Sequence, residues 1–143
     1  MSAKQTTLVL LKPDCVQDQH CGEVIRRFEA DGFQIRGLKL MTLSTELLEE
    51  HYAHVADKPF FPGIVEYMQE TPVVALALCA ENAVARVRDL LGPTNSAEAA
   101  KGTIRGDFGE DISRNVAHAS DSDENAAIEL KRFFADGEIF PQR

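Results

Sequence analysis

The sequence has little cysteine and no long apolar run, and each shortage argues against a class of protein. The three cysteines, Cys15, Cys21 and Cys79, form an odd set without a C-x-x-C pair. This argues against a disulfide framework or a structural zinc site and indicates a reducing compartment. The longest apolar run, Val73 to Ala80, is far shorter than the roughly 20 residues needed to cross a bilayer. Because the polar N-terminus also lacks a signal-peptide apolar region, we expect a cytoplasmic protein with no membrane partner.

Positive charge is also scarce, since 23 acidic residues face 15 basic ones and the formal net charge is −8. A non-specific nucleic-acid binder needs a basic face, so we expect no nucleic-acid partner. An anionic substrate would have to be held by local cations against the net field. His51 and His54 are three residues apart on a predicted helix, but the sequence shows no third ligand near them. We therefore predict no metal site formed by the protein itself.

The chain length predicts a single domain over residues 1–143, because two independent cores would each be marginal. A change of phase at Gly37 predicts a β-bulge there. Apolar patterning predicts helices near 22–31, 44–52, 61–68, 81–91 and 122–134, and strands at Thr6–Leu11, Phe33–Leu43, Val73–Cys79 and Asn115–Ser120. This order predicts an α/β sandwich of the ferredoxin-like kind (βαββαβ) with additional helices. We expect the helices to cover mainly one face of the sheet, and a long irregular loop over 92–114 to precede the last strand.

A histidine and a carboxylate near the end of the chain are candidates for chemistry. Period 2 places Val116, His118 and Ser120 on one side of the last strand. Glu129 falls at the edge of the apolar stripe of the following helix, where a carboxylate is costly without a partner. If that helix folds back over the strand, His118 becomes a candidate partner. The alternatives are an ordinary strand histidine and a solvated edge charge.

Several cations stand at the ends of predicted elements: Lys12, Arg88, Arg105 and Arg114, with Thr94 in the glycine-punctuated loop. Together they offer a binding site for a phosphate chain, although each alone has a simpler reading as a surface charge. Phe60 is left outside the apolar stripe of its helix, and is either a stacking surface for a planar ligand or an ordinary surface aromatic. Neither a G-x-x-x-x-G-K-S/T loop nor a G-x-G-x-x-G motif occurs.

Four motifs in order make the chain similar to the nucleoside diphosphate kinases, from about Thr6 to Phe134. The segment Asn115-Val-Ala-His-Ala-Ser-Asp-Ser122 matches the family signature Asn-x-x-His-Gly/Ala-Ser-Asp-Ser. The others are Leu11-Lys-Pro-Asp14, then His51-Tyr52 leading into Lys58-Pro-Phe-Phe61, and Gly102-Thr-Ile-Arg-Gly-Asp-Phe108.

The resemblance implies a ping-pong transfer of the γ-phosphoryl group from a nucleoside triphosphate to a nucleoside diphosphate. It implies that His118 is the nucleophile, that Glu129 fixes its tautomer and that Ser120 supports Glu129. It also implies a Mg²⁺ ion bound mainly through the nucleotide phosphates. The remaining roles that it implies are phosphate contacts by Lys12, Arg88, Thr94 and Arg105, ribose contacts by Lys12 and Asn115, base contacts by Phe60 and Ile112, and a place for Tyr52 beside the histidine.

The family implies a homo-oligomer, either a tetramer or a hexamer. Ser96 stands where the family commonly has proline, which predicts a less rigid loop and a gain in thermal stability for Ser96→Pro. Two alternatives remain on the same scaffold, a catalytically silent nucleotide-binding protein and a phosphohistidine relay to protein partners.

Overall fold

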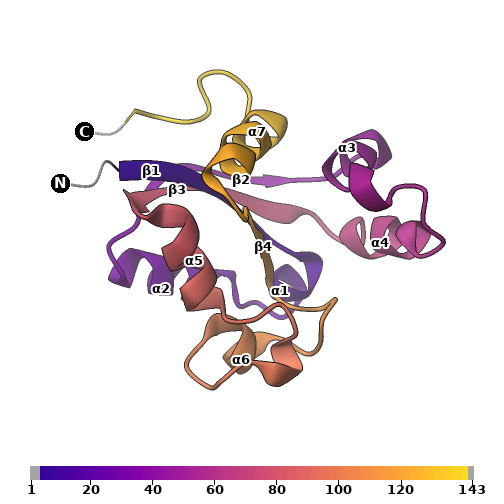
Figure 1. The fold of residues 1–143 in the computed structure, drawn as a ribbon, viewed down its shortest axis with the longest axis horizontal. Coiled ribbons are helices and arrows are strands. Elements are labelled where there is room, and N and C mark those ends of the chain that lie inside the picture. The colour runs from indigo at the N-terminus through magenta and orange to yellow at the C-terminus, as the bar shows by residue number, and fades with distance from the viewer. Residues whose placement is uncertain (1–3, 142–143) are drawn as a thin grey trace.

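Four strands form an antiparallel sheet in the order β2-β3-β1-β4 (Figure 1). The structure is a computed structural model that describes residues 4–141. The strands are β1 (Lys4–Leu11), β2 (Gln34–Met41), β3 (Val73–Glu81) and β4 (Ala117–Ala119). β3 lies inside the sheet between β2 and β1, as its continuous apolarity predicts. The pairing of β2 with β3 shifts register between Ile35 and Gly37, which confirms the predicted bulge.

The helices begin near the positions that the capping residues predict. The Ser44 hydroxyl accepts a hydrogen bond from the Leu47 amide at 3.0 Å, and the Ser122 hydroxyl accepts one from the Asn125 amide at 3.0 Å. The helices are α1 (Pro13–Gln17), α2 (Cys21–Ala30), α3 (Thr45–His51), α4 (Phe61–Met68), α5 (Ala83–Leu91), α6 (Ile104–Phe108) and α7 (Asp123–Phe133). Within residues 4–141, none is long and apolar enough to span a membrane.

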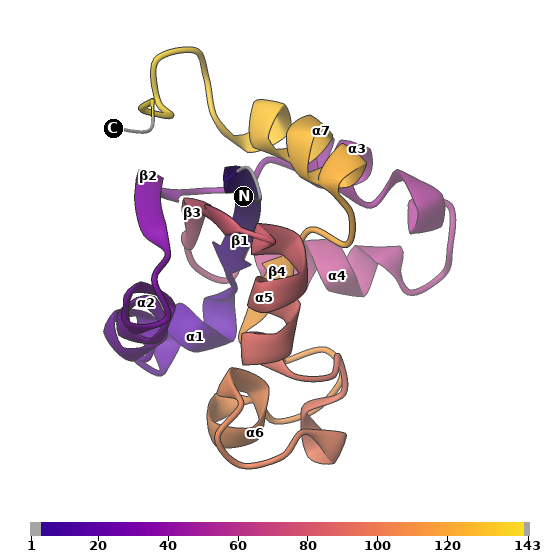
Figure 2. The same cartoon turned by 60° about the vertical axis from the view of Figure 1, so that its left-hand side comes forward.

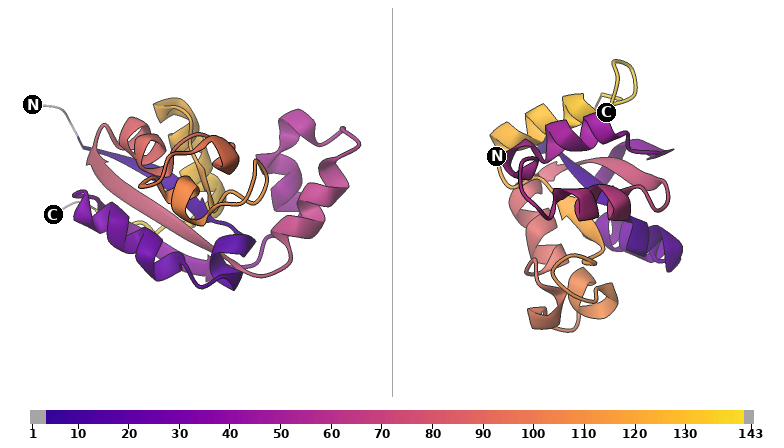
Figure 3. Two further views of the ribbon diagram at one scale, coloured as in Figure 1. Left: turned by 90° about the horizontal axis from the view of Figure 1, so that it is seen from below. Right: turned by 90° about the vertical axis from the view of Figure 1, so that its right-hand side faces the viewer.

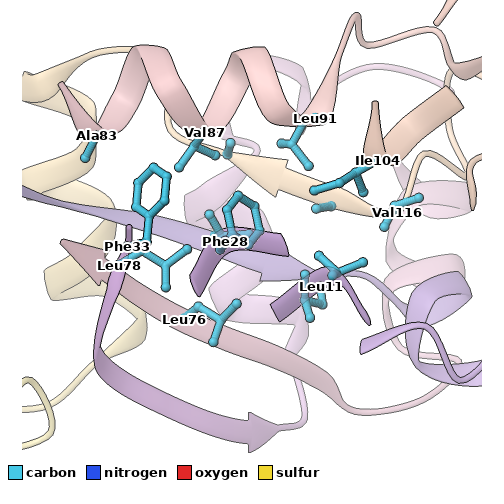
Figure 4. Packing of buried hydrophobic residues seen from close by; sticks show 14 of the residues in the cluster. Leu11, Phe28, Phe33, Leu76, Leu78, Ala83, Val87, Leu91, Ile104 and Val116 are labelled. Carbon is cyan, nitrogen blue, oxygen red and sulfur yellow. The ribbon is translucent and has the colours of Figure 1, made fainter. Parts of the chain in front are cut away.

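Helices cover both faces of the sheet, and the expectation of mainly one covered face is wrong. Figure 2 and Figure 3 show α3 and α7 on one side of the sheet and α2 and α5 on the other. Successive residues of β1 enter different cores, because side chains alternate along a strand. Leu8 and Leu10 pack with α3, α4 and α7, whereas Val9 and Leu11 pack with α2 and α5 (Figure 4). The fully apolar end of β1 is what a strand buried on both faces requires.

The predicted ferredoxin-like sandwich with additional helices is confirmed, with corrections before its last strand. β4 comprises Ala117–Ala119 and is shorter than the predicted Asn115–Ser120. The segment over 92–114 is not wholly irregular, since it contains a 3₁₀ turn (Ser96–Glu98) and α6. The Thr103 hydroxyl caps α6 by accepting a hydrogen bond from the Gly106 amide at 3.0 Å. Glycine spacing alone does not reveal a helix of a single turn.

Ser96 is the first residue of the 3₁₀ turn and its side chain is buried. Its hydroxyl has no hydrogen-bond partner within the described part of the chain, and its amide donates to the Asp111 carbonyl at 3.3 Å. The preceding Asn95 is extended, with φ −82° and ψ 107°, a conformation that a following proline favours. Proline therefore fits the backbone here and removes an unpartnered hydroxyl, at the cost of one long hydrogen bond.

We predict that Ser96→Pro raises the free energy of unfolding by about 0.5 kcal/mol, because proline restricts the unfolded chain where the native backbone already suits it. Ser96→Ala is the matched control, since it removes the hydroxyl and keeps the amide. Urea unfolding of the three proteins measures the difference. A proline variant less stable than the alanine variant would show that the hydrogen bond to Asp111 outweighs the restriction.

Candidate functional site

A cavity of about 680 Å³ opens between β4 and the helices α3, α5, α6 and α7. It brings together residues that the sequence separates by more than a hundred positions. The predicted site residues that line it are Lys12, Tyr52, Arg88, Thr94, Arg105, Asn115, His118 and Glu129.

Four other candidates lie outside the lining of this cavity. Ser120 is fully buried behind Glu129. Phe60 and Ile112 are exposed, by 57% and 62% of their surface. Arg114 forms an ion pair with Glu70 at 3.0 Å and is therefore not one of the cations that converge on the cavity.

His118 is oriented by a carboxylate from the facing helix, as predicted. The Nε2 atom of His118 lies 2.8 Å from Oε1 of Glu129, and the Ser120 hydroxyl donates to the same oxygen at 2.8 Å. Burial by itself would raise the pKa of Glu129, but the hydrogen bonds from His118 and Ser120 outweigh it and hold that pKa below its usual range. An ionised carboxylate accepts a hydrogen bond from the N–H group at Nε2. In the tautomer that this bond favours, Nδ1 carries no proton.

A strained turn at Val116 aims the histidine into the cavity. Val116 has φ +76°, and the Ala117 amide donates to the Asn115 carbonyl at 2.9 Å, which together define a γ-turn of the rare positive-φ kind. The turn breaks the strand alternation, so the predicted common face of Val116 and His118 is wrong. Figure 4 shows Val116 in the core beside Ile104, whereas His118 lines the cavity.

Two residues of the opposite segment hold this turn in place. The Asp14 carboxylate accepts a hydrogen bond from the Val116 amide at 3.0 Å, and the Lys12 amide donates to the Val116 carbonyl at 2.9 Å. Tyr67 also donates its hydroxyl proton to Asp14. A β-branched residue at positive φ persists only where its surroundings over-determine it, and these bonds do so.

The Lys12 side chain joins the first strand to the loop before β4. Its ammonium donates to Oδ1 of Asn115 at 2.8 Å and to the Ser113 carbonyl at 2.8 Å. Asn115 in turn donates to the carbonyls of Thr94 and Ile112, at 3.0 and 3.2 Å. Burial lowers the pKa of Lys12 to about 8. Lys12 is therefore the cation of this site whose charge changes nearest to neutral pH.

The guanidinium of Arg105 can be buried because backbone carbonyls take the place of the water molecules that would otherwise solvate it. Its guanidinium donates to the carbonyls of Asn115, Gly92 and Ala117 at 3.1, 3.0 and 2.7 Å. Burial, with a further contribution from the nearby charge of Arg88, lowers the pKa of Arg105 to about 10. Arg88 is exposed and donates to the Ala119 carbonyl at 3.4 Å. Of these two guanidinium groups, that of Arg105 is anchored by three carbonyls and that of Arg88 is exposed.

The structure adds two contacts that the sequence did not reveal. The ring of His51 meets the ring of His118 edge to face, with centroids 4.5 Å apart, and Arg132 donates to Nδ1 of His51 at 2.9 Å. Burial and then the charge of His118 lower the pKa of His51 to about 3, so this second ring is neutral. Burial also raises the pKa of the neighbouring Tyr52 to about 12. His51 occurs in a recognised motif, but no pattern distinguished Arg132.

His51, His118 and Glu129 also present ligand-type atoms within 4.8 Å of one another. The spacing of His51 and His54 did not reveal this grouping, because its other members come from β4 and α7. Each of the three already makes a hydrogen bond to a protein group. A metal here would have to break the contact that orients His118.

Comparison with known proteins gives one consistent family. The sequence model of the family described as nucleoside diphosphate kinase matches residues 5–139. A curated relative of that name from Archaeoglobus fulgidus is 50% identical over 135 residues, covering 94% of this chain and 89% of that protein. Nucleoside diphosphate kinase B of Flaveria bidentis is 49% identical over 131 residues, covering 92% of this chain and 88% of that protein.

Solved structures agree with the sequence relatives. A halophilic nucleoside diphosphate kinase from Halobacterium salinarum, solved in complex with CDP, superimposes with a TM-score of 0.93 at 38% identity, covering 99% of this chain and 94% of that one. The Aquifex aeolicus nucleoside diphosphate kinase gives a TM-score of 0.91 at 41% identity, covering 96% of this chain and 99% of that one.

We predict that Asp14→Ala lowers the free energy of unfolding by about 2–3 kcal/mol, because it leaves the Val116 amide buried without an acceptor. Asp18→Ala, an exposed aspartate directly after the same helix, is the control and should stay within about 0.5 kcal/mol of the unmodified protein. Urea unfolding monitored by circular dichroism measures both. Equal stabilities of the two variants would contradict the role of Asp14.

Proposed function

The chain belongs to the nucleoside diphosphate kinase family and transfers the γ-phosphoryl group of a nucleoside triphosphate to a nucleoside diphosphate, and we propose that His118 carries that group between the two nucleotides. The observation that supports this most directly is the hydrogen bond between Nε2 of His118 and Glu129. Among the described residues, no hydrogen bond involves Nδ1, and the ring lines a cavity whose lining also includes Lys12, Arg88 and Arg105. Nothing in the comparisons favours a silent nucleotide-binding protein or a phosphohistidine relay.

In the proposed first half-reaction, the lone pair of Nδ1 attacks the γ-phosphorus in line with the bond to the bridging oxygen. The nitrogen–phosphorus bond forms as the bond to the β–γ bridging oxygen breaks, and the nucleoside diphosphate leaves with that electron pair. The proton stays on Nε2 throughout and donates a hydrogen bond to Glu129, whose negative charge stabilises the positive charge that develops on the ring. A second diphosphate then takes the phosphoryl group by the reverse steps, which restores the neutral histidine.

The cations of the cavity would hold the phosphates. We assign phosphate contacts to Lys12, Arg88 and Arg105, with the hydroxyl of Thr94, because positive charge is needed where the transferred group spreads its negative charge. Their positions around the cavity support this assignment, as does the anchoring of Arg105 by carbonyls, which fixes a donor before the substrate arrives. Lys12 and Asn115 are assigned to the ribose hydroxyls, and Tyr52 to the wall beside the histidine.

The donor set fits a Mg²⁺ ion that enters with the nucleotide. Glu129 is already engaged by two hydrogen bonds, and the other carboxylates of the cavity, Glu50 and Asp121, are exposed. Mg²⁺ prefers oxygen ligands and retains several waters, so it is commonly held through phosphates and few carboxylates. When bound, the ion would neutralise phosphate charge, and Asp121, an exposed carboxylate of the cavity, would accept a hydrogen bond from a water of its shell.

Phe60 and Ile112 are proposed to hold the base between them, on the exposed surface next to the phosphate site. Both side chains are largely exposed, as a stacking platform requires. Stacking uses a π-face that every base possesses, so the proposed site accepts purine and pyrimidine nucleotides alike.

A homo-oligomer in the cytoplasm is the proposed state of the protein. β2 is an edge strand, and its Leu38 and Leu40 are exposed by 52% and 63%. An apolar edge strand invites pairing with another chain, and a second copy offers the matching edge. The cytoplasmic location rests on the three cysteines, all of which are free.

We predict that His118→Ala folds normally and loses more than about 10³-fold in phosphoryl transfer, as removal of a nucleophile does. Glu129→Gln should lose roughly 10- to 100-fold, the usual effect of a partner that orients a reacting group. His20→Ala, a histidine outside the cavity, is the control. A coupled transfer assay with circular dichroism tests all three, and substantial turnover by a folded His118→Ala would exclude the proposed nucleophile.

The lowered pKa of Lys12 predicts a pH dependence of kcat/KM, which reports the free enzyme. Lys12 is charged below pH 8 and loses its charge above it, so kcat/KM should fall by up to about tenfold per pH unit above that value. Lys12→Arg should move this decline to higher pH, because arginine stays protonated.

Stability should change in the opposite direction over the same range. Between pH 8 and 10.5 the unfolded chain retains a proton on Lys12 that the folded chain has lost, so the free energy of unfolding rises with pH there. Urea unfolding at several pH values shows whether a fall in kcat/KM has its origin in deprotonation of Lys12 or in denaturation. A kcat/KM that stays flat to pH 10 would contradict a role for the Lys12 charge.

A further inference from the structure

Two of the three cysteines lie side by side outside the nucleotide cavity. The sulfurs of Cys15 and Cys21 are 3.8 Å apart, and neither is in a disulfide. Cys15 belongs to α1 and is buried, whereas Cys21 is the first residue of α2 and is partly exposed. Cys79 lies buried on β3. No C-x-x-C spacing marks the pair, so the sequence alone does not distinguish Cys15 and Cys21 from Cys79.

The turn between α1 and α2 creates this proximity. Gln19 adopts φ +63°, the His20 amide donates to the Cys15 carbonyl at 3.0 Å, and the Gln19 amide donates to the Val16 carbonyl at 3.2 Å. These two bonds are those of a Schellman motif, which reverses the chain at the end of a helix. The reversal places residue 21 against residue 15, so the pair is fixed by local backbone structure.

The two thiols differ in the way that a reactive pair requires. Cys21 stands in the first turn of a ten-residue helix, where the helix dipole favours a thiolate. The hydrogen bond from Cys15 lowers the pKa of Cys21, and the same bond, together with burial, raises the pKa of Cys15. Cys21 is thus the accessible nucleophile, and Cys15 is a protonated thiol directly behind it.

We propose that Cys15 and Cys21 form a reversible dithiol–disulfide site that responds to hydrogen peroxide. The Cys21 thiolate attacks one peroxide oxygen, the O–O bond breaks, and the product is a sulfenic acid with release of hydroxide. The Cys15 sulfur then attacks the sulfenic sulfur, a water molecule leaves with the Cys15 proton, and the S–S bond forms. Two thiols have lost two electrons to the peroxide, and an external dithiol returns them by exchange.

Closure of the disulfide would reach the active site through α1. The sulfurs must approach from 3.8 Å to about 2.05 Å, and Cys15 directly follows Asp14, the residue that accepts the Val116 amide. A displacement of α1 therefore loosens the turn that aims His118. A displacement of a reacting group by about 1 Å can lower the rate by up to about 10²-fold. We therefore expect oxidation to lower kcat/KM by roughly tenfold.

The test uses the full chain carrying Cys79→Ala, in which only the proposed pair remains. After hydrogen peroxide, thiols are alkylated with N-ethylmaleimide in denaturant and the protein is analysed by intact mass and peptide mapping. We expect a Cys15–Cys21 disulfide, no alkylation, lower transfer activity, and recovery of both readouts with dithiothreitol. The matched control adds Cys15→Ala and Cys21→Ser, and its activity should be unaffected by the same peroxide dose.

Single variants separate the two roles. With Cys15→Ala, the sulfenic acid on Cys21 persists and is trapped by dimedone; with Cys21→Ser, Cys15 stays reduced. Faster oxidation of Cys15 than of Cys21, a disulfide between chains, or in the unmodified protein a disulfide to Cys79, would overturn the assigned pair. A closed Cys15–Cys21 disulfide with unchanged transfer activity would overturn its link to the active site.

Discussion

The γ-turn at Val116 is the constraint on which the site depends. A β-branched residue at φ +76° is unfavourable by itself, and it persists because Asp14 binds its amide and the Lys12 backbone binds its carbonyl. The turn buries the Val116 side chain with the α2–α5 core and sends His118 to the opposite side. From there Glu129 orients the ring. The segment that supports the turn also supplies the cation Lys12.

Much of this arrangement could be predicted from residues alone. The bulge at Gly37 follows from the phase of the strand pattern, and the structure confirms it. Periodicity made His118 a candidate partner of Glu129 only if the last helix folds back over the last strand, and the structure shows that the two side chains meet. The positive φ of Val116 could not be predicted, because valine disfavours it and only remote hydrogen bonds impose it. The proximity of Cys15 to Cys21 depends on the conformation of a single residue, Gln19.

A protein of net charge −8 keeps one cation of the site, Arg105, in its interior. Backbone carbonyls surround the guanidinium of Arg105, so its charge is retained in the interior without a carboxylate partner. An ion pair there would neutralise this charge. Dipolar groups solvate a cation and leave it able to attract an anion, which explains why carbonyls, and no acidic side chain, contact Arg105 within residues 4–141.

The sheet order β2-β3-β1-β4 has a consequence for how the protein is made. The contacts of the site join distant parts of the chain: Lys12 with Asn115 across 103 positions, and His51 with Arg132 across 81. Each of these contacts closes a long loop, which has a cost in conformational entropy. A nascent chain still on the ribosome lacks β4 and α7 until synthesis is nearly complete. Because His118 lies in β4 and Glu129 in α7, the cavity is completed only when nearly the whole chain has been synthesised.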